Sequence, residues 1–158
     1  MSTQAPILQH AQTARDRDHS HIGSRAGRGS GWFYWIAGLS LVNSILIQSG
    51  GSWSFVFGLG LTAGVDYLAQ TATGSGQLLA WVFNAVVIGA FVVFGHSARK
   101  GHRWAYLAGL AAYSADTALV VASKDWLAVV VHVFGLLLIL NGLAALNKRR
   151  TMEPSTAA

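Results

Sequence analysis

The sequence predicts an all-α polytopic membrane protein with four transmembrane helices and one further helix on the outer side of the membrane. Of its 158 residues, 53% are hydrophobic and only 11% are charged, whereas charged residues make up roughly a quarter of an ordinary soluble domain. The apolar stretches are also long enough for helices rising about 1.5 Å per residue to cross a hydrocarbon core about 30 Å thick. We therefore expect one small membrane domain.

Residues 1–30 precede the first apolar stretch and are rich in Ser, Gly, Arg, Gln and His. They show no sustained apolar periodicity, so they lack the surface whose burial would offset the entropy of ordering. We predict a flexible cytoplasmic tail. A cleaved secretory signal is the alternative, but the residues after Ile47 lack a small-x-small cleavage pattern, and we expect the first span to be retained.

The membrane domain is predicted over residues 31–147, with spans at about 31–48, 77–97, 104–123 and 126–146. The positions of the tryptophans support these span boundaries, because an aromatic ring with one polar atom prefers the membrane interface. The first turns of the spans contain Trp32, Trp35, Trp81, Trp104 and Trp126. Short connections make the second, third and fourth spans antiparallel neighbours. Residues 148–158 are predicted as a short cytoplasmic C-terminal tail.

The basic residues indicate the orientation of the spans. Every Lys and Arg except Lys124 lies on one predicted side of the membrane, and such an excess marks the cytoplasmic face. Both termini are therefore expected in the cytoplasm, and the net charge of +5 needs no nucleic-acid partner to explain it. We expect the basic clusters beside the spans to contact lipid headgroups; they comprise Arg99, Lys100, Arg103, Lys148, Arg149 and Arg150.

The segment 53–70 is long enough for a fifth crossing, but its charge context argues against one. A fifth span would move some of the basic clusters to the outer side. The segment carries an apolar stripe of Trp53, Phe57, Leu61, Val65 and Leu68, and a narrow polar stripe of Ser54, Gly58, Thr62, Asp66 and Gln70. We predict an amphipathic outer-side helix that either lies in the interface or re-enters the bundle.

Polar residues at similar depth in different spans predict a polar layer in the outer half of the membrane. Asp116 and His132 lie equally far from the predicted outer turn between their spans, about 10 Å inside the boundary. Asn84 and Asn43 fall at comparable depth, and Asp66 could cover the layer from the outer helix. An unpaired Asp inside a membrane costs about 2.5–3.5 kcal/mol on insertion scales, so we expect Asp116 to pair with His132. Such a pair can be a functional site or a structural polar contact.

Other site chemistry finds little support in the sequence. There is no cysteine, which excludes disulfides, thiolate metal sites and cysteine nucleophiles. Asp66, Asp116 and His132 have the donor types of a transition-metal site and form a weak candidate for one. No Gly-x-Ser-x-Gly elbow is present, and Gly58-Leu59-Gly60 lacks the βαβ context of a dinucleotide fingerprint. We therefore assign no metal, no cofactor and no enzymatic activity.

Several pairs of small residues have the four-residue spacing that allows helices to pack closely. These pairs are Gly60 with Gly64, Ala85 with Gly89, and Ala108 with Ala112. We expect them to form close-packing surfaces, either within the bundle or between copies of the protein.

Two stretches, Trp32–Ser40 (WFYWIAGLS) and Asp125–Phe134 (DWLAVVVHVF), resemble a group of small bacterial integral membrane proteins with four predicted spans and no known activity. The resemblance covers about residues 31 to 146. It implies a location in the bacterial inner membrane and implies no chemistry.

We expect a membrane interaction, assembly or structural component, in contact with the lipid bilayer and with further copies of itself or another membrane protein. The alternative is an oligomeric transporter or channel protomer in which Asp116 and His132 carry protons or cations. A membrane enzyme or metal-site protein is the third hypothesis. A buried and mutually satisfied Asp116–His132 pair would favour the first, a polar cavity reaching the pair the second, and an outward-open pocket where Asp66 joins them the third.

Overall fold

In the computed structural model, residues 4–49, 58–71 and 75–152 are described, and they form five α-helices and no strand. The helices are α1 (Gln4–Gln48), α2 (Gly60–Thr71), α3 (Gly76–Arg99), α4 (Arg103–Ala122) and α5 (Trp126–Met152). Four helical stretches are long and apolar enough to cross a membrane, namely Ser20–Gln48 within α1, and the whole of α3, α4 and α5. The predicted all-helical class with four apolar spans is confirmed for these residues.

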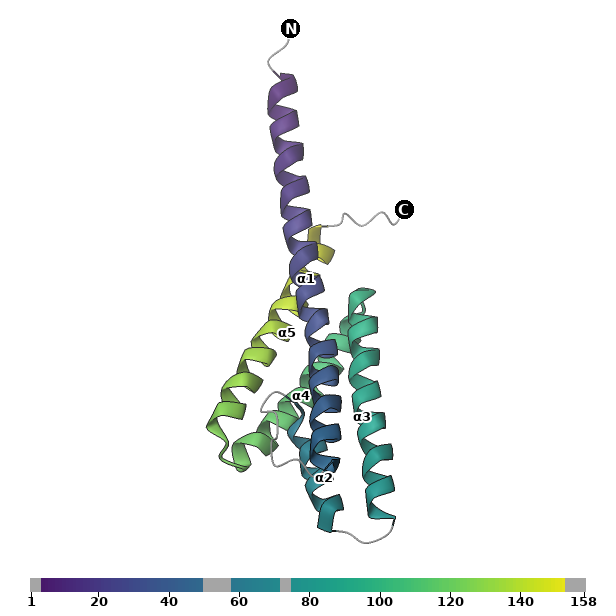
Figure 1. Ribbon diagram of the computed structural model, residues 1–158. Helices are drawn as coiled ribbons and strands as arrows, with labels where there is room; N and C mark the ends of the chain where they lie inside the picture. The colour runs from purple at the N-terminus through teal and green to yellow at the C-terminus, as the bar shows by residue number, and fades with distance from the viewer. Residues whose placement is uncertain (1–3, 50–57, 72–74, 153–158) are drawn as a thin grey trace.

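Helix α1 lies at the centre of the arrangement, packed between α3 and α5, and α4 closes the bundle by packing on the same two helices (Figure 1). Basic side chains gather at one end. There the Arg150 guanidinium donates to the carbonyl of Gly101, in the turn between α3 and α4, and Lys148 lies across a cavity from Arg25 and Arg28 of α1. We call this the basic end; the turn between α4 and α5 marks the opposite end.

The N-terminal segment differs from its prediction, because residues 4–30 belong to helix α1 rather than to an unstructured tail. Part of this stretch packs on the bundle through one helical face. Ile22 and Ser30 are buried, and the carbonyl of Ala26, midway between them, accepts a hydrogen bond of 2.7 Å from the Tyr106 hydroxyl. Composition alone could not show that α4 and α5 supply partners for this face.

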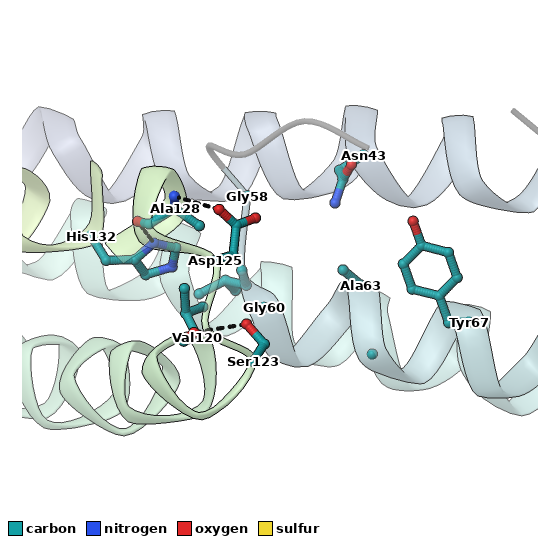
Figure 2. A pocket seen from close by; sticks show the side chains of 12 residues that line it. Asn43, Gly58, Gly60, Ala63, Tyr67, Val120, Ser123, Asp125, Ala128 and His132 are labelled. Carbon is teal, nitrogen blue, oxygen red and sulfur yellow. Dashed lines mark hydrogen bonds between the residues drawn. The ribbon is translucent and has the colours of Figure 1, made fainter. Parts of the chain in front are cut away.

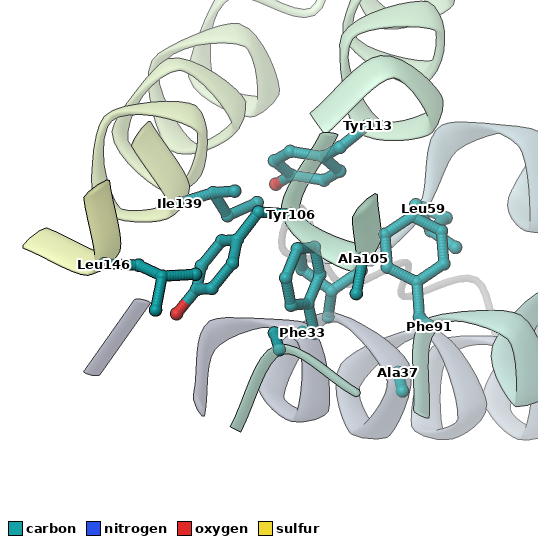
Figure 3. Close-up of a cluster of buried hydrophobic side chains, with 11 residues drawn as sticks. Phe33, Ala37, Leu59, Phe91, Ala105, Tyr106, Tyr113, Ile139 and Leu146 are labelled. Atoms are coloured by element: carbon teal, nitrogen blue, oxygen red, sulfur yellow. The ribbon is translucent and has the colours of Figure 1, made fainter. Parts of the chain in front are cut away.

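The apolar core lies around Phe33, which is fully buried (Figure 3). Its ring contacts those of Phe91 at 6.2 Å and Tyr106 at 6.0 Å between centroids. These distances fall in the range in which tilted aromatic pairs attract each other. Gly109 of α4 lies against the Phe33 ring, where a Cβ atom would overlap it. The core therefore ties α1, α3 and α4 together through one aromatic side chain.

Helices α1 and α5 cross at backbone contact through Gly29 and Gly142. A Cβ atom at Gly142 would lie 2.7 Å from the Gly29 Cα and 2.9 Å from a ring carbon of Tyr106. By contrast, Gly64 and Gly89, members of the predicted small-residue pairs, have open space where a Cβ atom would be. One close contact of the bundle is thus formed by a pair of glycines from two different helices.

Helix α2 is shorter than the predicted outer helix over 53–70. Residues 53–57 lie outside the described residues, and Gly58 and Leu59 precede the first helical residue. Leu59 contacts Ser40 of α1, which lies nine residues before Ser49 and so about 13 Å along the helix from it. Helix α2 therefore starts inside the bundle rather than lying across its end.

From this start, α2 runs parallel to α1 toward the opposite end, beside α1 and α3 (Figure 1). Thr62 and Asp66 of its polar stripe are fully buried, whereas Leu68 is 72% exposed. The polar side of α2 thus faces the bundle and its apolar side faces outward. Of the two predicted arrangements, these contacts fit a helix that enters the bundle, because the start of α2 is covered by protein.

The glycine crossing predicts that one substitution has opposite effects at two positions. Gly142→Ala should lower the free energy of unfolding by about 1–3 kcal/mol, because the added methyl group meets the backbone of Gly29. Gly89→Ala should leave it unchanged or raise it by up to about 1 kcal/mol, since alanine favours the helix and has space there. Unfolding in detergent micelles, followed by circular dichroism, measures both. Equal effects would show that the crossing is not tightly packed.

Candidate functional site

The site is a buried contact between α4 and α5. The Asp116 Oδ2 atom lies 3.0 Å from His132 Nε2, and the two side chains are 4% and 1% exposed. The turn between the helices holds Lys124 with φ of 60°, and Asp125 accepts a hydrogen bond from the Ala128 N–H at the start of α5. Since Asp116 and His132 are equally distant from this turn, two antiparallel helices bring them to the same level.

Asp116 also accepts hydrogen bonds from the first two N–H groups of α2. The Gly60 N–H donates to Oδ2 at 3.1 Å and the Leu61 N–H donates to Oδ1 at 2.8 Å. The N–H groups of a helix's first turn have no partner within the helix and carry the positive end of its dipole. A carboxylate therefore suits this position both as an acceptor and as a charge.

The start of α2 receives further support from α1. The Leu59 N–H donates to the Ser40 Oγ at 2.8 Å, while the same hydroxyl donates to the Ile36 carbonyl at 2.7 Å. Gly60 allows the close approach of α2 to α4, because a Cβ atom there would lie 2.6 Å from a methyl carbon of Val120. Side chains from two helices thus replace the water that would otherwise solvate this backbone.

The hydrogen-bond pattern indicates where the protons lie. His132 Nδ1 is 2.7 Å from the Ala128 carbonyl oxygen, and a carbonyl only accepts, so Nδ1 carries hydrogen. One further proton must then lie between Nε2 and Asp116 Oδ2, either on the ring as imidazolium or on the acid. Both forms of the pair are neutral overall, which limits the cost of burying it.

The His132 ring is held in place by Tyr113. The two rings stack with centroids 5.0 Å apart and planes 15° apart. The hydroxyl of Tyr113 and the indole nitrogen of Trp32 are both buried. Both approach Gly135 of α5 so closely that a Cβ atom there would overlap them. Tyr113 therefore fixes the imidazole through its ring face rather than through its hydroxyl.

A second polar cluster surrounds Asp66 of α2. Its Oδ1 accepts hydrogen bonds of 2.7 Å from the amide groups of both Gln48 and Asn84. The Asn84 amide also donates to Ser44 Oγ at 3.0 Å. Asp66 Oδ2 and Asn84 Oδ1 are buried and lack a hydrogen-bond partner in the described part of the chain. Helices α1, α2 and α3 are joined by this cluster.

The residues of the predicted polar layer are all buried. Four of them lie in two clusters, and Asn43 lines a cavity beside His132. Asp116 and His132 form one, while Asp66 and Asn84 belong to the other. The weak metal candidate of Asp66, Asp116 and His132 is therefore wrong, because the described residues include no group of three such ligands. Asp66 lies six residues beyond the start of α2, about 9 Å along the helix from the contact with Asp116.

Two cavities border the Asp116–His132 pair. One, of about 250 Å³, opens at the opposite end and has His132, Asn43, Tyr67 and Asp125 among its lining residues (Figure 2). The other, of about 310 Å³, is an apolar groove between α3 and α4 that reaches Asp116. The pair therefore separates a partly polar cavity from an apolar one.

The predicted headgroup-contacting residues lie at the basic end and are all exposed. Two of them make contacts within the chain. The Arg99 guanidinium carbon lies 6.0 Å from the centre of the Tyr34 ring, and Arg150 donates to the Gly101 carbonyl at 2.9 Å.

Sequence reasoning missed three residues that complete the two clusters, namely Ser40, Gln48 and Gly60. A signal for Gly60 was present, because the Gly58-Leu59-Gly60 run interrupts the amphipathic pattern where the helix begins. Ser40 and Gln48 carried no such signal, since single polar residues in an apolar helix are common near its ends.

The fold and site define a class: a helical bundle with four apolar helices and one half-length helix whose start is held by a buried carboxylate–histidine pair. The chain matches no protein-family model, no curated protein and no solved structure.

The site predicts a large loss of stability from a small change. Asp116→Asn removes an acceptor from the start of α2 and breaks the pair, so it should lower the free energy of unfolding by about 3–5 kcal/mol. Hydrogen exchange should rise at residues 58–71 before it rises in α3. Both effects can be measured in detergent micelles, by denaturant titration and by mass spectrometry.

The matched control is Asp125→Asn, which makes the same chemical change at an exposed helix cap where Asn serves nearly as well as Asp. It should change the free energy of unfolding by less than about 0.5 kcal/mol. If both variants unfold alike, Asp116 does not hold α2.

Proposed function

We propose that this protein is a multi-pass component of the bacterial inner membrane that works through contacts with other membrane-embedded chains rather than by turning over a substrate. Large apolar side chains support membrane embedding, because they are exposed on all four long helices; examples are Trp35, Val86, Leu107 and Val130. A soluble protein rarely exposes apolar surface so continuously. The resemblance in residues 32–40 and 125–134 supports the bacterial location.

The orientation we propose places the basic end in the cytoplasm. Basic residues of α1, the α3–α4 turn and α5 share this end, as the excess of Lys and Arg on cytoplasmic sides favours. Both termini then lie in the cytoplasm, and α2 enters the bundle from the outer side. The described part of the opposite end carries the single basic residue Lys124.

The observation that carries the proposed function is that every polar side-chain atom of the Asp116–His132 pair already has a hydrogen-bond partner. The carboxylate oxygens bind the Gly60 and Leu61 N–H groups and the imidazole, and the second imidazole nitrogen binds Ala128. A catalytic or transporting pair needs an atom free for a substrate or a moving proton. In this pair, Asp116 instead binds the first N–H groups of α2 and holds that helix in place.

The surface that we propose for contact with a second copy lies along α2 and α3. An apolar groove of about 320 Å³ lies between α2 and α3 and is lined by Leu68, Ala69, Leu79 and Phe83, among others. Leu68 and Leu79 are 72% and 65% exposed. Close packing against another helix would cover both side chains, and dispersion contacts of this kind drive association in membranes.

This surface can be tested with single cysteines, since the chain has none of its own. Leu68→Cys should give a disulfide-linked dimer upon mild oxidation in native membranes. Val130→Cys, at a side chain of α5 that is 65% exposed, is the control and should remain monomeric. Equal cross-linking at both positions would indicate random collisions and contradict the proposed surface.

A second candidate function, passage of protons or cations, is favoured by the cavity that reaches His132 from the opposite end. The imidazole lines a partly polar space there, and the Asp66 carboxylate has a buried oxygen without a partner in the described residues. A conducting protein would need a continuing path to the basic end through the aromatic core around Phe33.

Reconstitution into liposomes separates the two functions. Under our proposal, wild-type protein passes no more protons than protein-free liposomes do, under a potassium-valinomycin potential and with an internal pH dye. Transport would instead give a wild-type flux that Asp116→Asn and His132→Ala reduce at least about tenfold, as loss of an essential proton carrier should. Circular dichroism of the same samples shows whether each variant is folded.

A further inference from the structure

A cavity of about 440 Å³ lies between α1 and α5 at the basic end. From α1 it is lined by His21, Ile22, Arg25 and Arg28, and from α5 by Asn141, Ala144, Ala145 and Lys148. It is separate from the Asp116–His132 site, which lies nearer the opposite end. Neither the polar clusters nor the proposed contact surface uses any of these residues.

The glycine crossing explains why a cavity forms at this place. Gly29 and Gly142 bring the two backbones into contact, and helices that cross diverge on either side of the contact point. On the N-terminal side of Gly29, residues spaced three or four apart line the opening wedge from each helix, as neighbours on one helical face do. Ile22 and Ala145 are buried and form its apolar floor.

The cavity is built for an anion. Arg25, Arg28 and Lys148 contribute positive charge, His21 and Asn141 contribute further hydrogen-bond donors, and no acidic side chain is among its described lining residues. Neither Arg25 nor Arg28 makes a hydrogen bond or ion pair with another described residue. Their position contrasts with that of Arg150, which donates to a backbone carbonyl.

We infer that this cavity binds a phosphate group through Arg25 and Arg28. A guanidinium presents paired donors that match two phosphate oxygens, and Lys148 adds a point charge from the facing helix. The phosphate belongs either to the headgroup of an anionic phospholipid or to a small soluble phosphate. Either ligand would fasten the N-terminal part of α1 to α5, since its contacts come from both helices.

The test uses the full chain, purified in a neutral detergent and stripped of lipid, with binding followed by native mass spectrometry. Dioleoylphosphatidylglycerol is the anionic probe, dioleoylphosphatidylcholine the zwitterionic one, and inorganic phosphate the soluble one. The double variant Arg25→Gln/Arg28→Gln should bind the anionic probe at least about tenfold more weakly than wild type, because two charge-assisted contacts are lost.

The control is Lys124→Gln, which removes a positive charge from the turn between α4 and α5, at the opposite end of the bundle from the cavity. It should weaken binding less than about twofold, as expected for distant, screened charges. Equal losses in the Arg25/Arg28 double variant and the control, or no preference of wild type for either net-anionic probe over phosphatidylcholine, would overturn the site.

The three probes also distinguish the sources of the phosphate. Preference for phosphatidylglycerol with Arg25/Arg28 dependence assigns the cavity to a lipid headgroup, whereas the same dependence for inorganic phosphate alone assigns it to a soluble ligand. Should the Arg double variant unfold, Ala144→Glu places a negative charge at the cavity wall without removing an arginine. That variant must lose binding to the same extent, and retained binding would contradict the inference.

Discussion

The structure depends on the carboxylate of Asp116. One side chain accepts hydrogen bonds from the first two N–H groups of α2 and meets His132 of α5 at 3.0 Å, so three helices converge on two oxygen atoms. The start of a helix inside an apolar bundle is otherwise costly, because its N–H groups have neither water nor carbonyl partners. Helix α2 begins beside Asp116, inside the bundle, so it is shorter than the four long helices. Its polar side faces the bundle and its leucines face outward.

The second polar cluster and the glycine crossing complete the support of α1. Asp66, Asn84 and Ser44 connect the far half of α1 to α2 and α3, while Gly29 and Gly142 join its N-terminal half to α5. Side-chain hydrogen bonds thus connect the far half of α1 to α2 and α3, and close backbone packing connects its N-terminal half to α5. Each mechanism is suited to apolar surroundings, where burial of further apolar surface gives little driving force.

The sequence was informative wherever a pattern extends over many residues. Hydropathy and the basic clusters give the four long helices, and equal distance from the α4–α5 turn places Asp116 and His132 at one level. Contacts made by single residues could not be read in this way. The face of Ile22, Ala26 and Ser30 lies within a mostly polar segment, and its partner Tyr106 is 80 residues further along the chain from Ala26. Likewise, Gly29 and Gly142 are 113 residues apart, and no local spacing rule relates them.

The position of Asp116 in the chain has a consequence for the order of assembly. Helix α2 is synthesised well before α4 and α5, yet the acceptor for its first N–H groups and the histidine beside that acceptor belong to these later helices. While the ribosome is still producing α3, the start of α2 has no carboxylate to bind. In the membrane location that we propose, water would solvate the start of α2 until the α4–α5 hairpin supplies this acceptor.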